Sequence, residues 1–181
     1  MPMTRAHVKA VCRSEWRTDP KVDVGRGELR AGWGLVGDGH AGPPRPGRWQ
    51  VSLLAWEDVA TLNRERGLQA VPGSFAENLS TQGLDTSGLA VGDRLGIGER
   101  VVLEVEQLGK PPDIAHTYSF GGYSLLPTGG VFCSVIVGGV VSAGDEIGVL
   151  GPPDGRGVRL RCPLFPLPAG EPRAEEAKRA S

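Results

Sequence analysis

Glycine and proline interrupt this chain so often that long regular elements are excluded over most of it. The 181 residues include 28 glycines and 15 prolines, and the runs between them are short and rich in aliphatic and β-branched side chains. Strands are expected at residues 7–12, 50–54, 94–97, 101–107, 131–137 and 146–150, and a helix at 56–66 that ends at Gly67. This pattern predicts a mainly β protein, a small closed barrel with one or a few short peripheral helices.

Composition limits both the organisation and the partners of the chain. A hydrophobic content of 39% and a charged content of 23% suit one domain with one core. The net charge of −1 provides no general attraction for nucleic acid, so nucleic acid is not an expected partner. Because no apolar run reaches membrane-spanning length and residues 1–16 lack a signal-peptide core, we expect a cytoplasmic protein without a membrane partner.

The three cysteines predict reduced thiols, because they lie far apart and form no C-x-x-C pair. Cys133 alternates with valines at 131, 135 and 137, which places it on a core-facing side of a strand. Cys12 is expected to take a similar place in the first strand. Residues 1–150 are expected to form the barrel domain. Residues 151–181, which include Cys162, form a proline-rich extension that is partly disordered or docked, either on the barrel or on a partner subunit of a homodimer.

Several ordered strings carry a resemblance to a known family. They are GLVGDGHAG at 34–42, PGSFAENL at 72–79, VGDRLGIG at 91–98, VVLEVEQLGK at 101–110 and the late segment GGVFCSVIVGGVVSAGDEIGVL. Together they resemble the MOSC domain, the family named for the C-terminal domain of molybdenum cofactor sulfurases, from about Val8 to Val149. The resemblance implies a small β-barrel of complex topology that binds molybdenum cofactor. Where small members carry a cysteine after the Gln-x-x-Gly-Lys stretch, this chain has Pro112, which offers neither a ligand atom nor an N–H group.

The glycine-rich first loop, residues 34–54, is one candidate binding element. Glycine backbone at Gly37 and the guanidinium of Arg48 are suited to an anion such as the phosphate of a pterin cofactor. Asp38 and Ser52 are placed in the same cofactor-binding set, and His40 is a candidate acid or base. The alternative is that an arginine of this loop pairs with Asp38 and fixes the shape of the loop.

Two further loops complete the predicted site. In the second, Asn78 suits the edge of a pterin, and Glu77 would act as a general base if partly buried. Capping of loop N–H groups explains these two residues equally well. In the third loop, Lys110 would bind phosphate and His116 would titrate near neutral pH. No metal site is predicted, because no spacing of His, Cys, Asp and Glu matches a known metal motif.

Three functions remain open from the sequence. The first is binding of molybdenum cofactor or a related pterin, as a carrier or in sulfur and metal handling, and the retained loops favour it. The second is a molybdenum-dependent reductase of N-hydroxylated compounds, which requires a substitute thiol. The third is a cofactor-independent lyase or hydrolase in which His40, Glu77 and His116 perform acid–base chemistry on a small molecule.

Overall fold

The protein is described by a computed structural model over residues 5–17, 19–45, 49–110 and 118–153. The predictions for Arg48, Pro112, His116 and Cys162, and for the extension from residue 154 onward, lie outside the described residues. No helix in these ranges is long and apolar enough to cross a bilayer.

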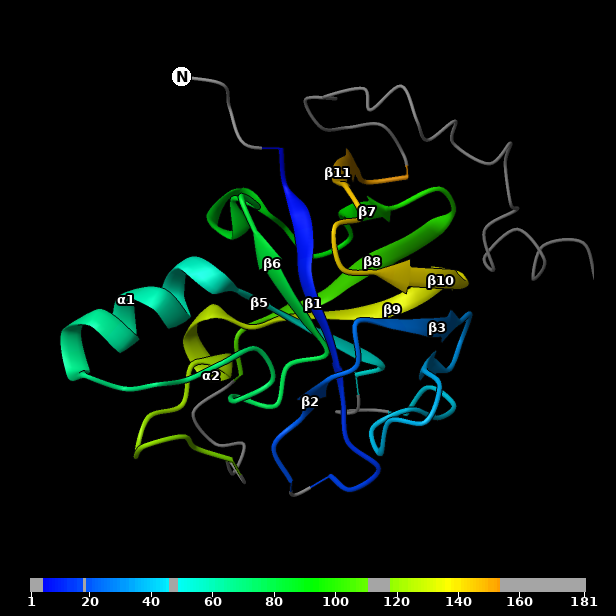
Figure 1. Cartoon of the computed structure of the whole chain (residues 1–181). Helices are drawn as coiled ribbons and strands as arrows, with labels where there is room; N and C mark the ends of the chain where they lie inside the picture. Colours follow the sequence, from blue (N-terminus) through cyan, green and yellow to red (C-terminus); the bar gives the residue numbers. More distant parts are fainter. Residues whose placement is uncertain (1–4, 18, 46–48, 111–117, 154–181) are drawn as a thin grey trace, which may run out of the picture.

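An eight-stranded sheet forms most of the molecule (Figure 1). In spatial order its strands are β11 (Ile147–Gly151), β7 (Arg94–Ile97), β8 (Val101–Leu108), β9 (Val131–Val137), β5 (Val51–Ala55), β6 (Leu79–Gln82), β1 (His7–Arg13) and β2 (Val22–Asp23). Neighbours are antiparallel except β5 and β6, which are parallel. A parallel pair needs a crossover, and helix α1 (Trp56–Arg66) provides it. The helix ends at Gly67, whose φ of 65° is left-handed, as expected from the sequence.

A second, three-stranded sheet covers one side of the curled sheet. It consists of β10 (Gly139–Ser142), β3 (Arg26–Arg30) and β4 (Gly34–Leu35), in that order. Figure 1 shows β3 and β10 on one side of the molecule and α1 and the short helix α2 (Leu126–Gly129) on the other. A single 3-10 turn, Thr86–Gly88, lies between β6 and β7.

The mainly β class is confirmed, but the barrel is not closed. The large sheet curls through 206° and stays open. At the opening, the start of β1 approaches the start of β11: Val8 N–H donates to Asp145 O and Ile147 N–H to Ala6 O, both at 2.8 Å. These bonds join only the first residues of the two strands. The small sheet then covers core side chains that a closed barrel would enclose, because Leu29 and Val141 lie in the same core.

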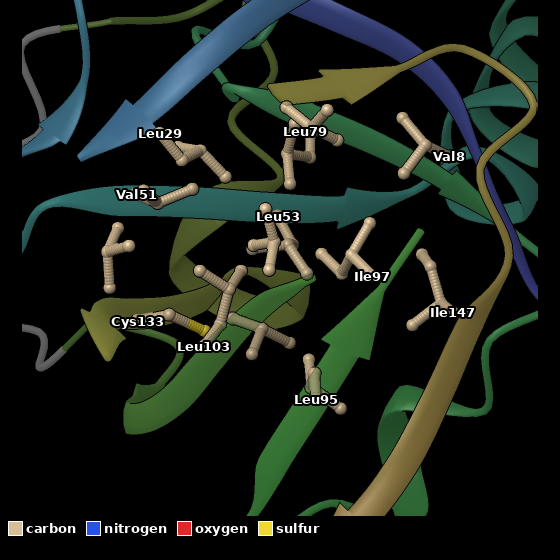
Figure 2. Close-up of a cluster of buried hydrophobic side chains, with 14 of the residues drawn as sticks. Val8, Leu29, Val51, Leu53, Leu79, Leu95, Ile97, Leu103, Cys133 and Ile147 are labelled. Carbon is tan, nitrogen blue, oxygen red and sulfur yellow. The ribbon is translucent and has the colours of Figure 1, made fainter. Parts of the chain in front are cut away.

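The core lies inside the curl of the large sheet. Figure 2 shows side chains from strands of both sheets pointing toward one another, among them Leu53, Leu79, Leu103 and Cys133, each 0% exposed. Cys133 therefore occupies the core position that its alternation predicted. The six expected strands are all present to within one or two residues, while the short strands β2, β3, β4, β6 and β10 were not predicted.

The core prediction concerns Leu53, which lies in the middle of β5 between β9 and β6. Leu53→Ala should lower the free energy of unfolding by about 2–5 kcal/mol, because a fully buried leucine leaves a cavity. Urea denaturation followed by tryptophan fluorescence measures the loss. Val140→Ala on β10, where the side chain is 52% exposed, is the control and should change stability by less than about 0.5 kcal/mol.

Candidate functional site

Three loops meet where β1 ends and β6 begins. The first is the connection after β1, residues 14–21; the second is residues 36–45; the third is residues 71–78. Backbone hydrogen bonds join them: Gly39 N–H donates to Ser14 O at 2.8 Å, and Lys21 N–H to Gly73 O at 3.1 Å. Gly73 has a φ of 87°, and a Cβ there would overlap the carbonyl oxygen of Lys21. The glycine-rich loop and the loop of residues 71–78, which are the first two loops predicted to bind a ligand, therefore converge, and residues 14–21 lie between them.

A buried ion pair connects residues 14–21 with the glycine-rich loop. The Lys21 ammonium lies 2.7 Å from both carboxylate oxygens of Asp38, and the two side chains are 2% and 0% exposed. Asp38 also accepts hydrogen bonds from the N–H groups of Ser14, at 3.2 Å, and His40, at 3.0 Å. The buried Asp38 carboxylate is thus bonded within the protein, and a charge pair fixes the loop, but the partner is Lys21 and not an arginine of the loop as the sequence-based alternative had it.

The pKa values of the pair reflect competition between burial and attraction. Burial alone would raise the pKa of Asp38, but the neighbouring His40 and Lys21 outweigh it and hold that pKa well below its ordinary range. Burial lowers the pKa of Lys21, and the Asp38 charge opposes that shift. Each charge is therefore sustained in the interior by the other.

Glu77 holds the loop of residues 71–78 from within. Its side chain is 0% exposed and accepts hydrogen bonds from Gly73 N–H at 2.7 Å, Phe75 N–H at 3.2 Å and the Ser80 hydroxyl at 2.7 Å. Burial raises the pKa of Glu77, and these donors partly offset the rise. Ala76, between two of the bonded residues, has a left-handed φ of 67°. The geometry matches the capping role that the sequence offered as an alternative to a general base.

Asn78 and Ser52 connect β5 with β1 ahead of β6. The Asn78 amide oxygen accepts from Ser52 N–H at 3.1 Å, and its amide nitrogen donates to Cys12 O at 3.3 Å. Asn78 and Ser52 are 2% and 8% exposed. The structure brings these two predicted cofactor-binding residues together, but their polar groups form hydrogen bonds that connect strands.

Most N–H groups of the glycine-rich loop are already engaged. The N–H groups of residues 36, 38, 39, 41 and 42 donate to carbonyl oxygens and that of His40 to Asp38. Gly37 N–H has no acceptor among the described residues. The expected row of anion-binding donors is thus reduced to one position. The His40 ring is partly exposed, with Nδ1 3.5 Å from an Asp38 oxygen.

The third predicted loop begins at Lys110, beside a different group of residues. The half-buried Lys110 ammonium lies 5.4 Å from the centre of the Phe132 ring. The Trp49 ring stacks on Phe132 with centroids 4.6 Å apart. Burial lowers the pKa of Lys110. A cation and two aromatic rings therefore form a small surface, called here the Lys110 surface.

This surface is the rim of a second apolar cluster outside the main core. Six of the chain's ten aromatic residues lie in it or against it: Trp49, Trp56, Phe75, Phe120, Phe132 and Tyr123. Phe75 and Phe120 meet edge to face at 5.9 Å. Phe75 follows Gly73 in the loop held by Glu77, so the buried polar groups support this cluster through that loop.

The described cysteines are both buried thiols. Cys12 and Cys133 are 0% exposed, and burial raises the pKa of each. Cys12 lies outside the main core, with its Cβ 3.3 Å from the position that a Cβ on Gly73 would occupy. Within the described ranges, no three His, Cys, Asp or Glu side chains are grouped so that they would hold a metal ion.

The prediction for this region compares the loss of one charge of the Lys21–Asp38 pair with the loss of both charges. Lys21→Met leaves Asp38 buried without a counter-ion, so the free energy of unfolding should fall by about 3–5 kcal/mol in urea denaturation at pH 7. The double variant Lys21→Met/Asp38→Asn removes both charges and keeps an oxygen for Ser14 and His40, so it should recover more than half of the loss.

The exposed pair of Arg5 and Glu146, 3.1 Å apart, provides the control. Arg5→Met should cost less than about 1 kcal/mol, because the arginine side chain is 79% exposed. A double variant no more stable than Lys21→Met would contradict the assignment of the loss to an unpaired charge.

Comparison with solved structures shows the same fold in several bacterial proteins. YuaD from Bacillus subtilis is similar at a TM-score of 0.61 and 19% identity, over 80% of this chain and 94% of that one. YiiM from Escherichia coli is similar at a TM-score of 0.55 and 27% identity, over 81% of this chain and 69% of that one. YiiM from Geobacillus stearothermophilus is similar at 0.55 and 15% identity, over 80% and 74%.

Among curated proteins, none matches the chain. The family model described as the MOSC domain matches residues 37–148. That stretch begins in the glycine-rich loop, contains both Glu77 and Lys110, and ends in β11. It covers more than half of the sequence and all of β5 to β9, but it begins after β1 and β2. The chain belongs to the MOSC domain family.

Proposed function

We propose that this protein binds molybdenum cofactor or a related pterin, as a carrier or in sulfur and metal handling, and that the Lys110 surface holds the organic part of the ligand. The MOSC family is linked to molybdenum cofactor. Family membership alone does not fix the ligand of a particular chain, so the proposal depends on the chemistry of the residues present.

The position of Lys110 carries the proposal. Its ammonium is half-buried, and among the described residues no carboxylate lies within ion-pair distance of it. A cation that is partly removed from water without a counter-ion is stabilised by a bound anion. The phosphate of a pterin cofactor provides such an anion, as the sequence suggested for this lysine.

The aromatic rings beside Lys110 suit a planar ligand. Trp49 is partly exposed, and its ring packs against Phe132 at a tilt of 38°. In this proposal the exposed part of the Trp49 ring contacts a flat heterocycle. Arg48 precedes Trp49 in the chain, and residues 111–117, which include His116, follow Lys110. The proposal keeps Arg48 as a second phosphate-binding group on the basis of its sequence alone.

The residues suit the organic part of the cofactor better than its metal. Cys12 and Cys133 are fully buried thiols with raised pKa values, so neither presents a thiolate at the Lys110 surface. When bound, the cofactor itself would supply redox chemistry, and the role proposed for this chain is to bind and orient it.

The other two functions receive less support from the geometry. The reductase needs a substitute thiol, and Cys133, the candidate in the late segment, points into the core. The acid–base enzyme needs Glu77 at a substrate, whereas Glu77 is buried and bonded to its own loop. His40 remains a partly exposed candidate whose role is untested.

The test compares two lysines that both lie over aromatic rings. Lys110 lies over Phe132, and Lys9 lies 4.8 Å from the centre of the Trp56 ring. The protein is purified without oxygen from a host that makes molybdenum cofactor and from one that cannot, and pterin and molybdenum are measured per chain. Pterin should copurify only from the first host.

Lys110→Met should weaken binding about 10- to 100-fold, because a charge-assisted contact is lost, while Lys9→Met should bind as the wild type does. Absence of pterin in the wild type, or equal pterin in both lysine variants, would refute the proposal.

A further inference from the structure

Two arginines from the connection after β1 lie against the glycine-rich loop. Arg13, the last residue of β1, donates from Nη1 to the carbonyl oxygen of Val36 at 3.3 Å. Arg17 donates from Nε to the carbonyl oxygen of Gly39 at 3.0 Å. The two guanidinium groups therefore contact carbonyls only three residues apart, one on each side of Gly37.

Neither arginine has a counter-ion in the part of the chain that the structure describes. None of the ion pairs there includes Arg13 or Arg17. Asp38, the acid of the loop itself, is occupied by Lys21, and the exposed acids of the same connection, Glu15 and Asp19, are not paired with either arginine. A guanidinium has five N–H donors, and the recorded bond of each arginine uses one of them. Several donors of both side chains therefore remain for a ligand.

Gly37 lies directly beneath the Arg13 side chain. Its φ is 83°, and a Cβ at this position would lie 2.8 Å from Arg13 Nη1. The residue is exposed, and its N–H is the one in residues 36–42 without an acceptor among the described residues. Glycine is therefore needed here for two reasons: the backbone is left-handed, and any side chain would displace the guanidinium.

We infer that Arg13, Arg17 and the N–H of Gly37 form a binding site for a phosphate group. Guanidinium groups bind phosphate oxygens through paired, charge-assisted hydrogen bonds, and a free backbone N–H in a glycine turn adds a neutral donor. Asp38 lies in the same loop, but its charge is neutralised by Lys21 and its carboxylate is buried, so it does not repel an anion at the surface as a free aspartate would. The site consists of other residues than the Lys110 surface and does not rest on the function proposed above.

The source of the phosphate is either the free ion or the ester of a larger molecule. The full chain, labelled with ¹⁵N, is titrated at constant ionic strength with inorganic phosphate and with ribose 5-phosphate, and acetate serves as the carboxylate control. Both phosphates should shift the amide resonance of Gly37 in a saturable way. Tighter binding of the ester would identify a phosphorylated small molecule as the ligand class, and equal affinity would identify the free ion.

Matched variants decide whether the arginines form the site. Arg13→Gln and Arg17→Gln should each raise the dissociation constant for phosphate at least about fivefold, because each removes a charged donor. Arg26→Gln, at an exposed arginine at the start of β3, should leave it unchanged. Arg13 and Arg17 are exposed, so the Arg13→Gln and Arg17→Gln variants are expected to fold.

Three results would overturn the inference. One is the absence of a saturable shift at Gly37. Another is an Arg13→Gln or Arg17→Gln variant that binds phosphate as tightly as the wild type. The last is an Arg26→Gln variant that loses as much affinity as they do, which would mean that only the general charge of the surface matters.

Discussion

The ion pair of Lys21 and Asp38 is the interaction on which the arrangement of loops depends. It joins residues 14–21 to the glycine-rich loop in the protein interior, where an unpaired charge would be costly. The backbone N–H of Lys21 reaches Gly73, and Glu77 fixes the N–H groups of Gly73 and Phe75. Phe75 then packs on Phe120 in the aromatic cluster. A continuous set of contacts thus leads from one buried charge pair to the cluster whose rim carries Lys110.

This arrangement divides the polar residues of the chain into two groups. Asp38, Ser52, Glu77 and Asn78 are buried and bonded to protein, and they hold strands and loops together. The groups proposed for ligands are cations without a described counter-ion, at Lys110 and at the arginines beside Gly37, together with the partly exposed ring of Trp49. Such a surface suits anionic, planar molecules, which agrees with a family linked to molybdenum cofactor. The described thiols are buried, so the role proposed for this chain is binding through charge and aromatic contacts.

The extent to which sequence predicts this structure follows from the kind of contact involved. The six longer strands and α1 were predictable because aliphatic runs and Gly67 are local signals. Strand β6 was missed because its sequence, LSTQ, is mostly polar, yet Ser80 and Thr81 are buried. The Ser80 hydroxyl donates to Glu77, and the Thr81 hydroxyl donates to Leu54 O, 27 residues away. The same limit applies to Lys21: nothing near it in the sequence indicates burial, because its partner is 17 residues away. Asp38 and Glu77 were singled out from the sequence as candidate ligand-binding and catalytic residues, but their burial and partners are tertiary properties. The prediction of a closed barrel was likewise wrong, because the number of paired strands does not determine whether the two edges of the sheet meet.

Native-state amide hydrogen exchange tests most directly whether the buried polar groups form one stable unit with the sheet. The decisive amides are those of Gly73 and Phe75, which lie in a loop but donate to Glu77. If the account is right, they exchange with a free energy of opening close to that of the core amides of β5, near the global free energy of unfolding. Exchange of these two amides at the rate of an unprotected loop, while the β5 amides stay protected, would contradict it.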